Sequence, residues 1–231
     1  MTYNNYSLSL SKGKFYLKSK TPQQGYEEVT YGVNNKKKTY HKYFDKIEGV
    51  PSYFTVTEVN HDGNTLRFLE LSLKDGDDIN KISVNLKNKG GYTDETKAFV
   101  SALNGLELNE RVSITPYSKT TIGKNGKDYK NLSIFINYLE RTDSDGKNPS
   151  TGYIHFNDIP KPTSKTVAGD LVWDWTTQTE FYYEKINEIE QRFKTAGEKT
   201  TPKPKVNEHK PPFPTVNEED LKEEDYDDLP F

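Results

Sequence analysis

Lysines and tyrosines are interleaved in three short segments of this sequence, a combination suited to single-stranded nucleic acid. Ammonium groups can pair with phosphates, and each aromatic face can stack on a base, worth about 1 to 3 kcal/mol per stack. The segments are 36–44, 87–92 and 119–130. Any single tyrosine could instead pack across strands, and any single lysine could be a solvated surface charge. The candidate contacts are Lys36, Lys37, Lys38, Tyr40, Lys42, Tyr43, Lys87, Lys89, Tyr92, Lys119, Lys124, Lys127, Tyr129 and Lys130.

Residues that could support catalysis are sparse. The four histidines, at 41, 61, 155 and 209, lie in separate segments without metal-ligand spacing, and the chain has no cysteine. The sequence also has no Walker A run and no Gly-x-Ser-x-Gly motif. Asp75, Asp77 and Asp78 surround a glycine, and turn chemistry explains them without a metal. We therefore expect a protein that is not an enzyme and needs neither a metal nor a cofactor.

The end of the sequence has the character of a peptide that a partner protein binds. Residues 217–231 hold eight Asp or Glu and one Lys, and they finish on an apolar Leu-Pro-Phe with a terminal carboxylate. Acidic side chains can steer the segment to a basic surface, while the terminal ring fills an apolar pocket. An acidic run alone could be a solvating tail, but the apolar end does not serve solubility. The expected partner contacts are Asp225, Asp227, Asp228, Leu229, Pro230 and Phe231.

The last five residues, Asp227-Asp228-Leu229-Pro230-Phe231, resemble the C-terminal tip of bacterial single-stranded DNA-binding proteins. Phage proteins of that class share an acidic run that ends in Phe. The resemblance covers the tail only. It implies DNA coating in replication, recombination and repair, with the tail recruiting replication and recombination proteins. The longer N-terminal part is more similar in plan to phage proteins of the T7-like group, so the bacterial tetramer is not implied, and a monomer or dimer is favoured.

Charge is distributed unevenly along the chain. The formal net charge is -3, and residues 217–231 contribute -7, which leaves +4 for residues 1–216. A basic body with an acidic tail is typical of proteins that contact nucleic acid, although a solvated surface could show the same balance. Hydrophobic residues make up 32% of the chain, so part of it is expected to remain unpacked. We find no signal-peptide pattern or apolar run of membrane-spanning length, and expect a cytoplasmic protein that does not contact membrane.

The apolar pattern predicts a mainly β protein. Alternating segments over 53–59, 66–73 and 79–86 predict three strands, with a possible bulge where the phase changes within 66–73. A helix is expected after the capping pattern at 93–96, followed by strands over 111–117 and 132–139. This order matches the OB-fold, a five-stranded Greek-key barrel. A hairpin about 11–14 and two strands within 26–47 are expected to extend the barrel at its N-terminus.

Four regions follow from these patterns. Residues 1–141 form the OB-fold domain with its N-terminal β extension, and 142–196 form a connecting segment and an amphipathic helix. That helix has an apolar stripe at Tyr182, Ile186, Ile189 and Phe193, which we expect to pack on the barrel rather than form a dimer contact. A proline-rich linker over 197–216 leads to the disordered acidic tail, 217–231.

The function that these features favour is sequence-independent binding of single-stranded DNA. Two alternatives remain open at this stage. The OB-fold could bind RNA, since no base-reading motif is present. It could also be a protein-interaction adaptor whose aromatic residues are all structural.

Overall fold

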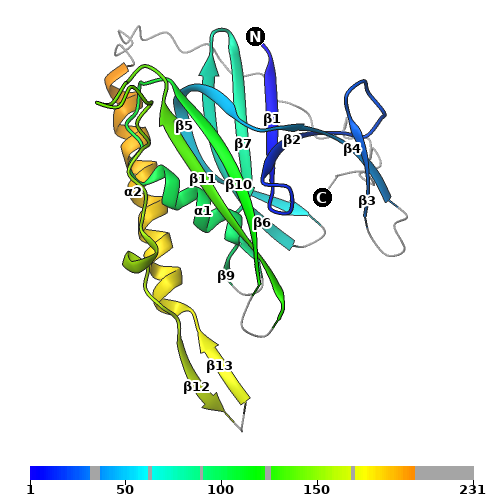
Figure 1. Cartoon of the computed structure of the whole chain (residues 1–231), viewed down its shortest axis with the longest axis vertical. Helices are drawn as coiled ribbons and strands as arrows, with labels where there is room; N and C mark the ends of the chain where they lie inside the picture. Colours follow the sequence, from blue (N-terminus) through cyan, green and yellow to red (C-terminus); the bar gives the residue numbers. More distant parts are fainter. Residues whose placement is uncertain (32–36, 62–63, 89–90, 123–125, 168–169, 201–231) are drawn as a thin grey trace, which may run out of the picture. The chain divides into compact units, whose positions relative to one another are not determined.

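The computed structural model describes residues 1–31, 37–61, 64–88, 91–122, 126–167 and 170–200 (Figure 1). The fold is mainly β, with one large mixed sheet, a short helix and a long C-terminal helix. The linker beyond residue 200 and the acidic tail lie outside the described residues. The strands are β1 (Tyr3–Ser9), β2 (Lys14–Ser19), β3 (Glu27–Tyr31), β4 (Lys37–Phe44), β5 (Ile47–His61), β6 (Asn64–Asp75), β7 (Asp78–Asn85), β8 (Lys87–Asn88), β9 (Gly91–Tyr92), β10 (Val112–Ile122), β11 (Asp128–Tyr138), β12 (Thr163–Val167) and β13 (Asp170–Asp174). The helices are α1 (Asp94–Leu103), α2 (Thr176–Thr200) and a 3-10 turn, η2 (Phe156–Asp158).

The predicted order of elements is present between residues 47 and 138. Strands β5, β6 and β7 form an antiparallel meander, α1 follows, and β10 and β11 form a long hairpin. The predicted N-terminal extension is present as the hairpins β1–β2 and β3–β4. The main sheet has the order β11-β10-β5-β6-β7-β1-β2-β4-β3. Among the described residues, β11 and β3 are its edges, so no ladder closes it into the expected barrel.

The N-terminal strand explains why the sheet stays open. In an OB-fold the last strand closes the barrel on the third, but here the free edge of β7 pairs in parallel with β1, from Tyr3 opposite Ile79 to Ser7 opposite Ser83. The turn between β1 and β2 then meets β10. A side chain at Gly13 would lie 2.4 Å from the backbone nitrogen of Ser118, and Gly13 has a φ of +60°. The N-terminal hairpin is therefore joined to β7 by a hydrogen-bonded ladder and contacts β10 by packing.

Alternation along β6 and β7 builds the centre of the core. Leu69, Leu71 and Leu73 are fully buried on one face of β6, and Ile82 of β7 lies opposite Leu71. The bulge predicted in β6 is not there. Leu66 and Phe68 are half-buried on the face of β6 opposite to Leu69 and Leu71, and this stretch pairs regularly with β5. The register shift falls in β5, between Pro51 and Tyr53. A proline cannot donate to the ladder, which favours an irregularity at that position.

Helix α1 begins where the sequence predicted. The Thr93 hydroxyl accepts a hydrogen bond from the Thr96 backbone N–H at 3.1 Å, which caps the first turn. The hydroxyls of Thr93 and Thr96 both donate to the carbonyl oxygen of Asn85, at 2.7 and 2.8 Å. These bonds tie the helix start to the end of β7, so that Phe99 and Leu103 enter the core.

Helix α2 packs on the same core, as expected. All four residues of its predicted stripe, Tyr182, Ile186, Ile189 and Phe193, are buried against the sheet and α1. The helix begins at Thr176, one residue before the predicted capping pattern, and Asp174 Oδ1 accepts from the Thr176 N–H at 2.9 Å. The apolar stripe is thus buried against other elements of the same chain.

The connecting segment has structure that its composition did not predict. Strands β12 and β13 form a separate two-stranded hairpin, and its register runs from Thr163 opposite Asp174 to Val167 opposite Asp170. Among the described residues, no helix is both long enough and apolar enough to cross a membrane.

Candidate nucleic-acid interface

Three exposed aromatic rings and a lysine share the outer face of the β10–β11 hairpin. The pairing places Phe135 opposite Thr115, Tyr117 opposite Ser133, Lys119 opposite Asn131, and Tyr129 opposite Thr121. Residues two apart on a strand, and diagonal residues on neighbouring strands, lie about 7 Å apart on one face. The four side chains of Tyr117, Lys119, Tyr129 and Phe135, hereafter the hairpin face, therefore follow one another along the hairpin.

The rings of the hairpin face are about half exposed. Tyr117 is 54% exposed, Phe135 50% and Tyr129 48%, and exposed apolar side chains that are grouped rather than scattered are typical of interaction sites. Within the described part of the chain, Lys119 forms no ion pair. Polar bonds keep the hairpin ordered, since Asn131 Nδ2 donates to Thr121 Oγ1 at 2.8 Å. Three half-exposed rings and a lysine therefore stand together on a well-paired hairpin, and such a set can stack on bases and pair with a phosphate.

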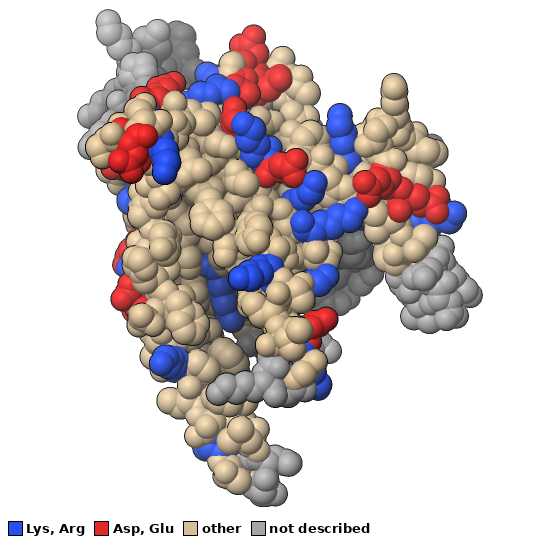
Figure 2. All heavy atoms as spheres, in the orientation of Figure 1, with Lys and Arg blue, Asp and Glu red and all other residues tan. Residues whose placement is uncertain are grey.

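The β10–β11 and β3–β4 hairpins differ in the sign of the charged side chains around them. Figure 2 shows mostly Lys, Arg and uncharged residues around the lower part of the β10–β11 hairpin. Asp and Glu gather at the upper margin and over the β3–β4 hairpin. A polyanion would meet less repulsion along β10 and β11.

The lysines of β4 are partly neutralised by β3. Lys38 Nζ lies 3.0 Å from Glu28 Oε1, and the Tyr40 hydroxyl is 3.4 Å from the other oxygen of that carboxylate. Lys12, on the neighbouring turn, pairs with Glu27 at 2.6 Å. These carboxylates follow from the register, which sets Glu28 opposite Tyr40. The densest lysine segment of the sequence is therefore a less basic surface than its composition indicates.

The aromatic rings of β4 face other side chains. Tyr16 and His41 stack with ring centroids 4.3 Å apart and planes 13° apart, and Tyr43 lies beside both. Lys12 Nζ sits 3.7 Å from the centre of the Tyr43 ring. Burial, then the nearby charges of Lys18 and Lys12, lower the pKa of His41. The cluster of Tyr16, His41 and Tyr43, hereafter the β4 cluster, therefore joins β2 to β4 and has its ring faces covered.

The prediction that Tyr92 contacts nucleic acid is wrong. Its side chain is 6% exposed and belongs to the hydrophobic core, with its ring centroid 6.1 Å from that of Tyr182. Burial raises the pKa of the Tyr92 phenol. Strand β9 places this ring in the core beneath α2. The sequence of residues 87–92 alone does not indicate that burial, because α2 comes from a distant part of the chain.

The remaining predicted contacts are divided by the fold. Lys130 lies on the opposite face of β11 from Tyr129, because neighbouring residues of a strand point to opposite faces. Lys42 is exposed, with its Nζ 5.5 Å from the Phe44 ring, and Lys37 is exposed at the start of β4. Lys127 is exposed at the end of the hairpin turn. Lys36, Lys89, Lys124 and the tail residues Asp225, Asp227, Asp228, Leu229, Pro230 and Phe231 lie outside the described residues, as does the side chain of Lys87.

Two members of the hairpin face, Tyr117 and Phe135, were missed by sequence reasoning. The strands that contain them were predicted, but neither residue was named as a contact. Their alternation with Ile114, Ile134 and Ile136, which are buried, was the signal that they face outward.

Acidic residues of the β6–β7 turn have structural partners. Asp75 Oδ1 accepts from Arg111 Nη1 at 2.7 Å, and Asp78 Oδ1 accepts from the Thr2 N–H at 3.0 Å. Gly76 has a φ of +60°, as a tight turn requires. These contacts agree with the interpretation of the cluster as turn chemistry.

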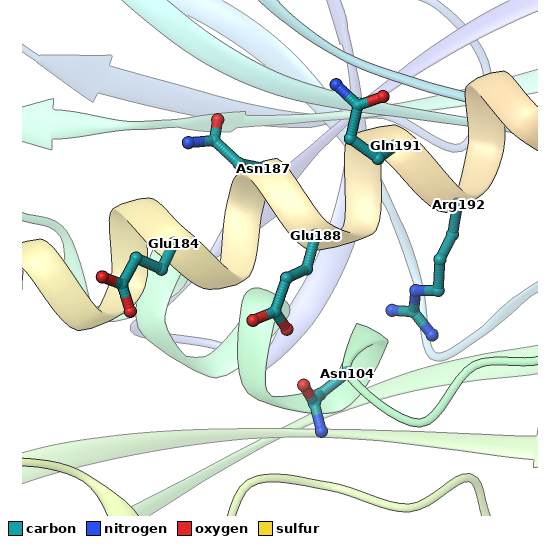
Figure 3. A pocket seen from close by; sticks show the side chains of 6 residues that line it. All are labelled: Asn104, Glu184, Asn187, Glu188, Gln191 and Arg192. Carbon is teal, nitrogen blue, oxygen red and sulfur yellow. The ribbon is translucent and has the colours of Figure 1, made fainter.

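A polar hollow of about 750 Å³ lies between α2 and the end of α1 (Figure 3). Arg192 reaches across it and donates to the carbonyl oxygens of Leu103 and Leu106, at 3.0 and 3.2 Å. Leu103 is the last residue of α1, so its carbonyl has no helical partner, and Leu106 lies in the turn that follows. The role of Arg192 is thus to cap α1 and fix α2 in place.

Comparisons with known proteins identify no relative: no family model, no curated protein and no solved structure matches this chain.

Proposed function

We propose that this protein binds single-stranded DNA without sequence preference. The observation that carries the proposal is the hairpin face, where Tyr117, Tyr129 and Phe135 stand exposed beside Lys119. Exposed rings supply stacking surfaces that suit every base, and the lysine supplies a phosphate contact. By this proposal the protein coats single-stranded DNA in replication, recombination and repair.

The order of elements supports an OB-derived fold in this proposal. Strands β5, β6, β7, β10 and β11 with α1 before β10 follow the OB order, and the β10–β11 turn corresponds to a loop that OB-folds use for oligonucleotides. The N-terminal strand β1 takes the pairing position of the closing strand. We therefore propose an OB-fold opened by insertion of an N-terminal hairpin.

The acidic C-terminal segment completes the proposal as a recruiting peptide. Its residues outside the described part carry the features of a partner-bound terminus: net negative charge, a rigid proline and a terminal aromatic ring. Removing Phe231 alone should leave DNA affinity nearly unchanged and abolish the recovery of replication proteins from host lysate. Equal recovery with and without Phe231 would reduce the segment to a solvating tail.

Fluorescence anisotropy with labelled oligo-dT at two salt concentrations tests the DNA-binding proposal. Affinity should fall as salt rises, because phosphate contacts release counterions. Oligo-U and duplex DNA serve as competitors. Tighter binding of oligo-U would favour an RNA-binding protein, and undetectable oligo-dT binding at low salt would leave an adaptor role.

A further inference from the structure

The outer edge of β11 is only partly covered by the chain. Residues 149–151 run antiparallel to its end, where the Thr151 N–H donates to the Ile136 carbonyl oxygen at 2.8 Å and the Tyr138 N–H donates to the Pro149 carbonyl oxygen at 3.0 Å. After Thr151 the chain turns away from the edge of β11. The Ile154 N–H bonds to the Ser101 carbonyl oxygen on α1, at 3.1 Å. The short added strand thus stops at Thr151.

Backbone groups further along the same edge have no described partner. In an antiparallel strand, the N–H and C=O of one residue point to the same side, and the side alternates from residue to residue. Since Ile136 and Tyr138 bond outward, so must Ile134, Leu132 and Lys130, while the residues between them bond to β10. Within the described part of the chain, the outward groups of these three residues make no hydrogen bond. An open edge of this kind is a template for another extended chain.

This open edge lies in a groove of about 520 Å³. One side is β11 from Lys130 to Phe135, the floor is α1, and the opposite side is the segment from Tyr153 to Ile159. Phe156 is 77% exposed and Tyr153 56%, so the far side offers apolar surface. Lys130 is exposed at one end and makes no ion pair with a described carboxylate, while Lys97 lies 3.9 Å from Asp94. Among the residues that line the groove, the charge left without a partner is positive.

We propose that this groove binds an extended acidic peptide of a partner protein by adding it as a strand to β11. The peptide would extend the short strand that residues 149–151 form beside β11. Its backbone would pair with Lys130, Leu132 and Ile134. Five strand residues span about 16 Å. Apolar side chains of the peptide would pack against Tyr153 and Phe156, and a carboxylate would pair with Lys130. The inference does not depend on DNA binding.

The groove suits a peptide better than a nucleic acid. A peptide strand presents donors and acceptors at the spacing of the open edge, whereas a phosphate backbone offers acceptors only. The groove also holds a carboxylate, Asp94, beside its second lysine. Of the rings of the hairpin face, Phe135 borders the groove, whereas Tyr117 and Tyr129 do not line it.

Amide hydrogen exchange on the full chain, followed by NMR, tests the proposal. The probe is the synthetic peptide Glu-Val-Glu-Val-Glu-Val, with Lys-Val-Lys-Val-Lys-Val as its matched control. The acidic peptide should slow exchange at Lys130, Leu132 and Ile134 by about tenfold or more, because those amides become hydrogen-bonded. Exchange at Asn131, Ser133 and Phe135, already bonded to β10, should not change.

Two substitutions at one position separate backbone pairing from side-chain packing. Leu132→Pro removes only an outward N–H and spares the ladder to β10, so it should weaken peptide binding on the order of fivefold. Leu132→Ala keeps the N–H and should bind more tightly than the proline variant. If Leu132→Pro fails to fold, Phe156→Ser tests the far side of the groove without altering the strand, and it should also weaken binding.

Three results would overturn the proposal. One is the absence of alternating protection with the acidic peptide, in which case Lys130 simply guards a strand edge against association. Another is equal binding of the lysine peptide. The third is protection of the same three amides by oligo-dT, which would assign the groove to nucleic acid.

Discussion

The two hairpins predicted to contact nucleic acid have similar compositions and different surfaces. In the β3–β4 hairpin, Lys38 pairs with a glutamate of the neighbouring strand, and the rings of the β4 cluster cover one another. In the β10–β11 hairpin, Lys119 has no described carboxylate partner, and three rings are about half exposed. A segment rich in lysine and tyrosine therefore presents exposed charges and rings only where its cross-strand neighbours do not pair with them.

Removing two rings of the hairpin face should have the largest effect on DNA affinity. We expect Tyr117→Ala and Phe135→Ala each to weaken oligo-dT binding by about 1 to 3 kcal/mol, because each removes one stacking surface. Anisotropy titration measures the loss. Tyr183→Ala is the matched control, since this tyrosine is 59% exposed on α2. If Tyr183→Ala lowered DNA affinity as much as the other two substitutions, the hairpin face would not be the preferred binding surface.

Substitution in the β4 cluster should change stability more than binding. We expect Tyr43→Ala to lower the free energy of unfolding by about 1 to 2 kcal/mol, because it removes the ring beneath Lys12 and beside His41. DNA affinity should change little. Urea denaturation and the same titration measure the two quantities. Reduced affinity at unchanged stability would show that Tyr43 contacts DNA, as the sequence predicted.

Two lysines should differ in their contribution to salt dependence. Lys119→Gln should reduce the slope of log affinity against log salt by about 0.7, the value for one phosphate contact on a single strand. Lys38→Gln should leave the slope nearly unchanged, because Lys38 already pairs with Glu28. Titrations over a series of salt concentrations give both slopes. Equal slopes for the two variants would remove the electrostatic distinction between the hairpins.

The smallest effect concerns pH and His41. Its pKa is lowered in the folded state by burial and by Lys18 and Lys12, so the unfolded chain binds the proton more readily. The contribution to stability is complete above the unfolded pKa of about 6.5 and is lost as the pH falls through the lowered folded pKa. Thermal unfolding between pH 7 and 5 should show this loss, and His41→Gln should reduce it. DNA contacts at the hairpin face should not follow the same titration.

Local pattern alone determined the identity and order of most elements. The alternation of Leu69, Leu71 and Leu73, the cap at Thr93 and the stripe of α2 each depend on neighbours within a few residues, and all three were predicted. The charge asymmetry and the apolar C-terminus are likewise properties of sequence. Such features are visible without tertiary structure because their periodicity reflects a single strand or helix.

Only the tertiary structure decided which edges pair and which side chains stay uncovered. The parallel pairing of β1 with β7 joins residues 76 positions apart in sequence, and no local pattern distinguishes it from the closure of a barrel. In the resulting sheet, β11 lies at one edge beside β10, and no described residue pairs with that edge at Leu132. Tyr92 and Tyr129 look alike in sequence, but one lies in the core and the other on the surface. Exposure depends on the elements packed against a residue, and those elements come from distant parts of the chain.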